Sequence, residues 1–232
     1  MNKKESLLDK SLLIPFAILT AISIVFIYSS SSVVADADFG NQYFYLQRQL
    51  VALSIGLFAG AIFLFVPISF YRENGLLLIL ISAFLLSLVF IPGIGVEKNG
   101  SLRWINIGFN IQPSEIAKIF VPIYLCGYCL RRKDQLETSW WGFVKPLILT
   151  SIISVLLLLE MDLGATIVIF AIGILILFIG GAKFNQLLIL FLVFISIVIL
   201  IAYFNEERWS RVVSFSNPWD DVGGTDYQLI NA

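Results

Sequence analysis

The sequence predicts an all-α fold: a polytopic integral membrane helical bundle with about seven transmembrane helices. Composition is the first observation, because 59% of the 232 residues are hydrophobic and only 13% are charged, against about 25% charged residues in soluble chains. The second is that the apolar residues form runs of about the 20 residues that a helix needs to cross a bilayer. These runs do not alternate in polarity as the strands of an outer-membrane barrel do.

Five predicted spans are uncharged runs bounded by charged residues, at 10–36, 48–72, 73–97, 162–183 and 183–206. The first run is longer than the about 7–15 residues of a signal-peptide core, so we predict a retained span. Two less apolar spans complete the bundle. One covers 113–130 and contains Glu115 and Lys118, and the other covers 140–159, with Lys145 near its start, where a long side chain can reach the interface.

The basic residues predict the orientation of the spans. With a cytoplasmic N-terminus, nine of them lie inside and five outside, as the positive-inside rule prefers. Gly40 is then outside and Gln135 is cytoplasmic. The inside set is Lys3, Lys4, Lys10, Arg72, Arg131, Arg132, Lys133, Lys145 and Lys183, and the outside set is Arg48, Lys98, Arg103, Arg208 and Arg211.

Several function classes are excluded or weakened by composition. A net charge of −1 gives no basic field for nucleic acid, and the absence of histidine removes His-based catalysis. Cys126 and Cys129 have redox-motif spacing, but no βαβ pattern surrounds them and no further zinc ligands are close. We interpret them as two buried thiols on one helix face.

The first polar segment on the outer side runs from residue 98 to residue 118. Arg103 stands beside an interfacial tryptophan, which suits phosphate or sugar recognition. Pro113 fits the first position of a helix. Glu115, Lys118 and Ser114 share one face of that helix, by their spacings of three and four residues. The segment is either a binding site or a helix start with an ion pair that orders the bundle.

Two further polar segments are predicted on the outer side. In the turn between the fifth and sixth spans, Glu160 and Asp162 could act as a base or bind a cation, or Asp162 could simply cap the next helix. In the third segment, Asn217-Pro218 and Gly223-Gly224 indicate turns in an ordered outer loop. A solvated loop is the alternative there, and its acidic residues do not have EF-hand spacing.

The three segments together resemble the SEDS family of peptidoglycan glycosyltransferases, the FtsW/RodA/SpoVE group. The resemblance covers essentially the whole chain and looks closer to the division members than to the elongation members. Glu160-Met161 departs from the usual Gln-Pro, and Asn110 stands where some division members have a basic residue. The matching residues are Asn99, Gly100, Arg103, Trp104, Gly108, Gln112, Pro113, Ser114, Glu115, Lys118, Asp162, Gly164, Arg211, Phe215, Asn217, Pro218, Asp221, Gly224, Tyr227 and Gln228.

The resemblance implies a single SEDS-type transmembrane domain over residues 1–232, in a family whose members have about ten spans. It places Ala232, the last residue of the sequence, in the large periplasmic loop after the seventh span. The family's catalytic Asp is expected beyond Ala232, so we assign no catalytic residue and expect no polymerase activity from these 232 residues alone. The implied location is the bacterial inner membrane, at the division septum, with a cytoplasmic N-terminus.

The implied activity is polymerisation of lipid II into glycan strands during septal cell-wall synthesis. The implied partners are lipid II, a class B penicillin-binding transpeptidase of the FtsI type and other divisome membrane proteins. No cofactor is required and no metal ligands are predicted, although a divalent cation could assist. A lipid II flippase or transporter, which moves lipid without making glycan, and a noncatalytic divisome component are the alternatives.

The resemblance also implies roles for individual residues in substrate binding. Arg103, Lys118 and Arg211 would stabilise the leaving pyrophosphate, while Asp162 would line the cavity or cap a helix. Other residues would orient the helix start and Lys118, or contribute to substrate binding in the outer loop; these are Gln112, Ser114 and Glu115, and Asp221, Tyr227 and Gln228.

Overall fold

A computed structural model of the chain describes residues 10–98, 101–106, 110–204 and 209. In this part of the chain, helices of 17–30 residues stand at all seven predicted spans. Five of them are long and apolar enough to cross a membrane, while α4 is less apolar and α7 is shorter. The long helices are α1 (Lys10–Phe39), α2 (Phe44–Phe65), α3 (Ile68–Leu88), α4 (Pro113–Arg131), α6 (Trp140–Leu159), α7 (Leu163–Ile179) and α8 (Phe184–Tyr203).

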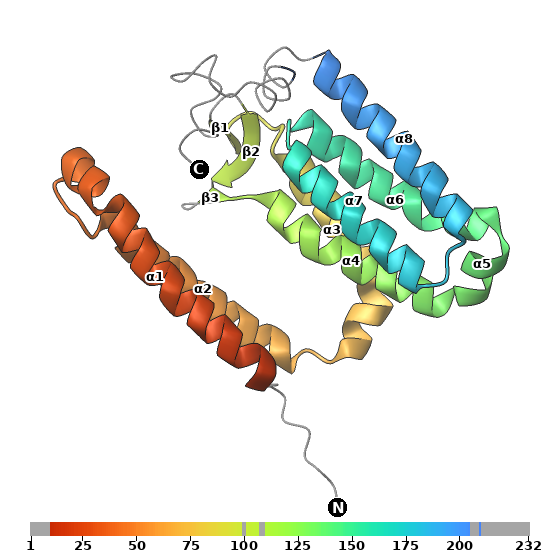
Figure 1. Ribbon diagram of the computed structural model, residues 1–232, viewed down its shortest axis with the longest axis horizontal. Coiled ribbons are helices and arrows are strands. Elements are labelled where there is room, and N and C mark those ends of the chain that lie inside the picture. Colours follow the sequence, from red (N-terminus) through yellow and green to blue (C-terminus); the bar gives the residue numbers. More distant parts are fainter. Residues whose placement is uncertain (1–9, 99–100, 107–109, 205–208, 210–232) are drawn as a thin grey trace, which may run out of the picture. The chain divides into compact units, whose positions relative to one another are not determined.

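The chain divides after Phe70 into two compact units. In the first unit, α1 and α2 pack side by side (Figure 1). Aromatic rings close the turn between them, because Phe39 stacks on Phe44 with ring centroids 3.9 Å apart. The guanidinium of Arg48 lies over the Phe44 ring at 4.5 Å, a geometry in which the cation is attracted to the ring face.

The second unit is built around a core shared by α3, α4, α6 and α7 (Figure 1). Each helix contributes apolar residues at intervals of three, four or seven, which is the spacing that places side chains on one face of a helix. The buried core residues are Ile79, Leu86, Ala117, Val121, Tyr124, Leu125, Ile153, Leu157, Ala165 and Ile169. This core positions the ends of α4, α6 and α7, where the polar residues lie.

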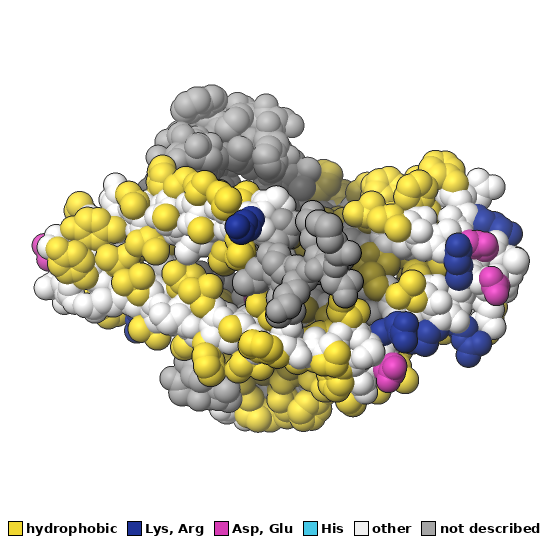
Figure 2. Space-filling model, turned by 90° about the horizontal axis from the view of Figure 1, so that it is seen from below, with side chains coloured by type: hydrophobic (Ala, Val, Ile, Leu, Met, Phe, Trp, Pro, Cys, Tyr) yellow, Lys and Arg dark blue, Asp and Glu magenta, His cyan; other side chains and the backbone are white. Residues whose placement is uncertain are grey.

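One end of the second unit carries a short helix that the sequence did not predict, α5 (Lys133–Thr138). Lys and Arg side chains gather at this end, while the sides of the helices are largely hydrophobic (Figure 2). Here Arg131 donates a hydrogen bond to the backbone oxygen of Arg72, and Lys183 donates to that of Thr138. Cys129 is buried but Cys126 is exposed, so the interpretation of two buried thiols is wrong for Cys126, which lies on an outward face of α4.

The opposite end carries a small antiparallel sheet that the all-α prediction did not include. Strand β2 (Ser101–Asn106) lies between β1 (Gly95–Lys98) and β3 (Asn110–Ile111), and Val96 pairs with Trp104. The ladder is irregular between Val96 and Glu97. The strands are too short and too polar to show the alternation of apolar and polar residues that would predict them. They form because pairing satisfies the backbone N–H and C=O groups of this segment between two spans. The sheet leads directly into α4.

Candidate functional site

The candidate site is a group of polar residues at the sheet end of the second unit, which we call the sheet-end cluster. Its members come from β2, from the start of α4 and from the turn between α6 and α7. They are Arg103, Gln112, Ser114, Glu115, Lys118, Glu160 and Asp162. The structure therefore brings together the first two polar segments of the sequence.

Strand β2 holds Arg103 against the end of α6. Its Nε donates to the backbone oxygen of Glu160 at 3.5 Å, and its Nη2 donates to that of Met161 at 2.5 Å. The C-terminal end of a helix carries partial negative charge and free carbonyl groups, so a guanidinium stabilises it. Arg103 thus has a structural role, and an arginine has further N–H groups that these two bonds do not use.

The turn after α6 has a defined hydrogen-bond pattern. Asp162 N–H donates to the oxygen of Leu157 and Met161 N–H to that of Leu158, which is a Schellman ending. This ending needs a left-handed residue, and Met161 provides it with a φ of 60°. The same ending closes α7, where the left-handed residue is Gly181. A side chain at this position is strained, and such strain is often found near functional sites.

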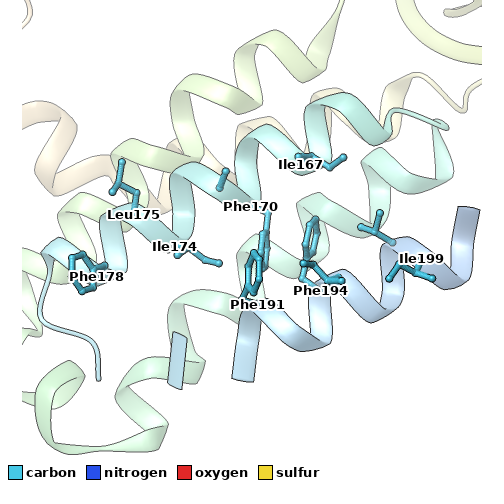
Figure 3. A pocket seen from close by; sticks show the side chains of 11 residues that line it. Ile167, Phe170, Ile174, Leu175, Phe178, Phe191, Phe194 and Ile199 are labelled. Atoms are coloured by element: carbon cyan, nitrogen blue, oxygen red, sulfur yellow. The ribbon is translucent and has the colours of Figure 1, made fainter. Parts of the chain in front are cut away.

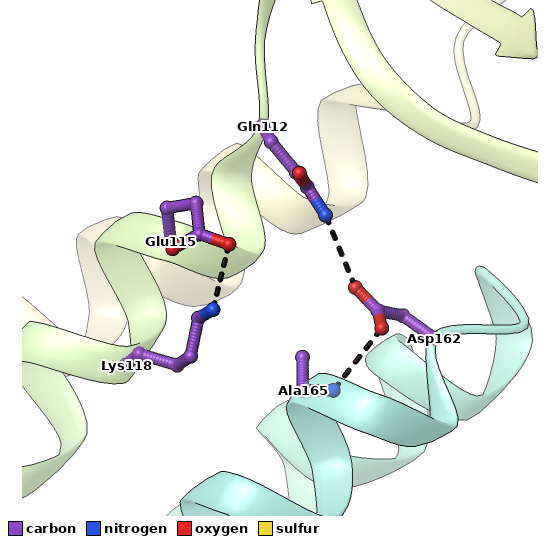
Figure 4. A network of polar contacts seen from close by, with 5 residues as sticks. All are labelled: Gln112, Glu115, Lys118, Asp162 and Ala165. Carbon is purple, nitrogen blue, oxygen red and sulfur yellow. Dashed lines mark hydrogen bonds and ion pairs between the residues drawn. The ribbon is translucent and has the colours of Figure 1, made fainter. Parts of the chain in front are cut away.

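Asp162 connects this turn to two helices. Its Oδ1 accepts a hydrogen bond from the backbone N–H of Ala165 at 3.1 Å, so Asp162 is the N-cap of α7, as one of the two interpretations predicted. Its Oδ2 accepts from Nε2 of Gln112 at 3.3 Å, across 50 residues of sequence. Gln112 is itself the residue before α4, so one carboxylate joins the starts of α4 and α7 (Figure 4).

Glu115 and Lys118 form an ion pair one turn into α4. Lys118 Nζ lies 2.6 Å from Glu115 Oε1, and the side chains of Lys118 and Glu115 are 28% and 60% exposed. The pair lies beside the Gln112–Asp162 contact (Figure 4). Pro113 occupies the first position of α4, and Glu115 lies in its first turn, as predicted. The ion pair agrees with both interpretations of this segment, because a paired lysine can also face a substrate.

Two side chains of the sheet-end cluster are buried without a hydrogen-bond partner in the described part of the chain. The atoms concerned are the hydroxyl of Ser114 and both carboxyl oxygens of Glu160. The pKa of Glu160 is raised from 4.5 to about 8, mainly by burial and also by the negative charge of Asp162, while the Arg103 guanidinium opposes the shift. From the sequence, Glu160 was predicted as a turn residue that could act as a base or bind a cation, and its burial was not predicted. Its spacing indicates the burial, because Glu160 lies three residues after the core residue Leu157 and therefore on the same face of the helix.

The remaining predicted site residues, Arg211, Asp221, Tyr227 and Gln228, lie outside the described residues. Ala232 lies outside them too, so its predicted place in an outer loop, with the family's catalytic Asp beyond it, stays a prediction. The sheet-end cluster therefore contains described residues of the first two polar segments, and none of them is assigned as catalytic.

The acidic residues of the described chain do not form a metal centre. Within residues 10–204, leaving aside the undescribed gaps, no group of three or more Cys, Asp or Glu side chains could hold a metal ion. The described sheet-end cluster therefore offers two cations and three acidic side chains, but not the ligand set of a structural metal centre.

An apolar groove of about 630 Å³ lies between α7 and α8 (Figure 3), and no residue of the sheet-end cluster lines it. Phe170 of α7 and Phe194 of α8 stack within it, with ring centroids 3.5 Å apart. Its walls are Ile, Phe, Leu, Val and Ala side chains, which offer no group for proton transfer or for binding an anion. Of these two places, only the sheet-end cluster has side chains that could bind an anion or transfer a proton.

Comparison with known proteins gives the chain a family. The FtsW/RodA/SpoVE family model, described as "Cell cycle protein", matches residues 9–232. A probable peptidoglycan glycosyltransferase FtsW from Pseudomonas fluorescens is 40% identical over 226 residues, which are 97% of this chain and 56% of the relative. A protein of the same description from Buchnera aphidicola is 39% identical over 212 residues, or 91% and 53% of the two chains. The chain thus spans little more than half the length of these relatives.

Solved structures share the fold. One chain, from a structure described as "Structural coordination of polymerization and crosslinking by a peptidoglycan synthase complex", matches with a TM-score of 0.74 and 26% identity, over 96% of this chain and 63% of that chain. The rod shape determining protein RodA of Thermus thermophilus matches with a TM-score of 0.57 and 27% identity, over 72% of this chain and 56% of RodA. Both are structures of the same multi-span helical architecture.

Proposed function

The chain belongs to the FtsW/RodA/SpoVE family of cell cycle proteins, and we propose that it forms part of a peptidoglycan glycosyltransferase that polymerises lipid II during bacterial division. Its relatives at 39–40% identity carry that enzyme description. The reaction joins a sugar carried on a lipid pyrophosphate to the hydroxyl of an acceptor sugar. It needs a group that takes the hydroxyl proton and positive groups that stabilise the departing pyrophosphate.

The observation that carries the proposal is the hydrogen bond between Gln112 and Asp162. It joins two sequence motifs that are separated by 50 residues and places both at one end of the helix core. Arg103 and Lys118 belong to the same cluster, and arginine and lysine are the side chains that bind phosphate groups in proteins. In this proposal Arg103 binds the pyrophosphate with the N–H groups that do not hold the turn.

The other residues have positioning roles in the proposal. Gln112, Ser114 and Glu115 orient the start of α4 and the Lys118 ammonium, while Asp162 fixes the start of α7. We assign the proton-accepting role to none of these residues, because Asp162 is committed to Ala165 and Gln112. Arg211, Asp221, Tyr227 and Gln228 complete the substrate site in the proposal.

The proposed setting is the bacterial inner membrane at the division septum, with a cytoplasmic N-terminus and the sheet-end cluster on the periplasmic side. The partner is a class B penicillin-binding transpeptidase of the FtsI type, together with other divisome membrane proteins. The complex that matches this fold is described as a peptidoglycan synthase complex that coordinates polymerisation and crosslinking, which supports a partner of this kind.

A chimera tests the proposal, with residues 1–232 replacing the matching part of the Pseudomonas fluorescens relative. The purified chimera, with the transpeptidase of that organism and lipid II, is expected to produce glycan strands. Transbilayer movement of lipid II without glycan would favour the flippase alternative. The absence of both glycan synthesis and lipid II movement would favour a noncatalytic divisome component. An arm with a chelator tests whether a divalent cation assists.

A further inference from the structure

Glu160 is a buried carboxyl group that the proposed function does not use. It directly follows the last residue of α6 and lies three residues after Leu157 and seven after Ile153, on the face of α6 that enters the core. Its exposed fraction is 1%, and neither carboxyl oxygen has a hydrogen-bond partner in the described part of the chain. The hydroxyl of Ser114, on the core-facing side of α4, is the second such group of the sheet-end cluster.

The charged groups around Glu160 are engaged elsewhere. Arg103 donates to the backbone oxygens of residues 160 and 161 rather than to the Glu160 carboxyl group. Asp162, on α7, adds negative charge and is held by Gln112 and Ala165. On α4 the nearest charges are Glu115 and Lys118, which pair with each other. The remaining charged residues at this end of the described chain, Glu97 and Lys98, lie on β1.

An ionised carboxylate in this position would be buried without a hydrogen bond and beside another carboxylate. Both conditions are costly, and a buried carboxyl group avoids them by keeping its proton. A protonated carboxylic acid is also a hydrogen-bond donor, which a carboxylate is not. The Ser114 hydroxyl is buried at the same end of the core and is likewise without a hydrogen-bond partner in the described part of the chain.

We propose that Glu160 is a proton-binding site: it is a neutral carboxylic acid at neutral pH and so positions the turn that contains Asp162 and is bound by Arg103 of β2. The raised pKa of Glu160, about 8, agrees with this geometry. When the proton leaves, a second negative charge appears beside Asp162 and competes with the turn carbonyls for Arg103. Glu160 is then a positioning residue whose state depends on pH. This inference does not require the proposed function.

Infrared spectroscopy of the purified chain tests the protonation directly. The spectrum at pH 6.5 is expected to contain the C=O stretching band of a protonated carboxylic acid, which disappears at pH 10 and is absent from Glu160→Gln at both values. The matched control is Glu137→Gln on α5, which removes an exposed carboxylate 3.7 Å from Lys133 and should leave the band unchanged. A wild-type spectrum without this band at pH 6.5, or a band that persists in Glu160→Gln, would overturn the proposal.

Thermal unfolding of the same proteins gives an independent measurement. Glutamine has the shape of the neutral acid and cannot ionise, so it reproduces the protonated form at every pH. A carboxyl group whose pKa is raised by folding contributes stability at low pH that is lost as the pH rises through the folded-state pKa. The Tm of Glu160→Gln minus that of wild type is therefore expected to grow between pH 4.5 and about 8 and to stay constant above that range. A difference that is the same at pH 5 and pH 9 would contradict the proposal.

Discussion

Gln112 donates a hydrogen bond from Nε2 to Oδ2 of Asp162, at 3.3 Å, and thereby joins the residue before α4 to the N-cap of α7. Both residues lie at the ends of helices whose apolar faces share one core. The contact is partly buried, and a hydrogen bond to a charged group in such a place contributes more than an exposed one. It is the link on which the geometry of the sheet-end cluster depends.

The Gln112–Asp162 contact predicts energetic coupling between the two residues. A double-mutant cycle of Gln112→Ala and Asp162→Asn, measured by unfolding in detergent, should give a coupling free energy of about 1–2 kcal/mol. The cause is that Gln112→Ala removes the donor and Asp162→Asn replaces the accepting oxygen by an NH2 group, so after either change the second one costs less. If the changes in free energy of unfolding of the two single variants sum to that of the double variant within about 0.3 kcal/mol, the two side chains do not interact in solution.

The capping role of Asp162 can be separated from its contact with Gln112. Asp162→Asn keeps a side-chain oxygen for the Ala165 N–H, whereas Asp162→Ala removes it. We expect the alanine variant to be less stable than the asparagine variant by about 1 kcal/mol. Equal stability of the two variants, measured by chemical unfolding, would mean that the cap contributes nothing.

The left-handed conformation of Met161 predicts a stabilising substitution. Met161→Gly should raise the free energy of unfolding by about 0.5–1 kcal/mol, because a left-handed backbone costs a side-chain-bearing residue about 1–2 kcal/mol and glycine recovers part of this. The matched control is Gly181→Ala, at the equivalent position after α7 with a φ of 97°. A side chain is strained at that φ, and an added Cβ would also lie 2.8 Å from Glu137 Oε1 and displace it, so this variant should be destabilised. A Met161→Gly variant that is less stable than wild type would contradict the claim that the left-handed backbone at Met161 is strained.

The spans could be predicted from the sequence because lipid demands long apolar runs, and the helices stand where those runs lie. Asp162 could also be predicted as a cap, because a short acidic residue before an apolar run signals a helix start. The sheet could not, because β3 has only two residues and its pairing is a long-range choice. The Gln112–Asp162 contact and the isolation of the Glu160 carboxyl group depend on how α4, α6 and α7 pack, which no local pattern records.

The proposed orientation predicts which loops an impermeant thiol reagent reaches in intact cells. Gln42 and Gln135 are both exposed and suit cysteine substitution, whereas Gly40 has a φ of 64° and would be strained. After Cys126 and Cys129 are replaced, the reagent should label Gln42→Cys in intact cells and Gln135→Cys only after permeabilisation. Labelling of Gln135→Cys in intact cells would show that the orientation is the opposite of the proposed one.

The role of the Glu115–Lys118 ion pair decides whether the sheet-end cluster is a substrate site or only a structural feature. In the chimera, Lys118→Met should abolish glycan polymerisation while the protein remains inserted and folded, because the ammonium is proposed to stabilise the departing pyrophosphate. If the pair were only structural, Glu115→Gln together with Lys118→Met would remove both charges and restore glycan polymerisation by the chimera.

The most direct test of the central claim is therefore the rate of lipid II polymerisation by the Glu115→Gln, Lys118→Met double variant of the chimera. Thermal unfolding of the same preparation shows whether the variant is folded, and Glu137→Gln provides a control that removes a charge at the other end of the helices. We predict that the folded double variant remains inactive, with a rate at least about tenfold below that of the unmodified chimera. Recovery of the unmodified rate would contradict the assignment of Lys118 to substrate binding.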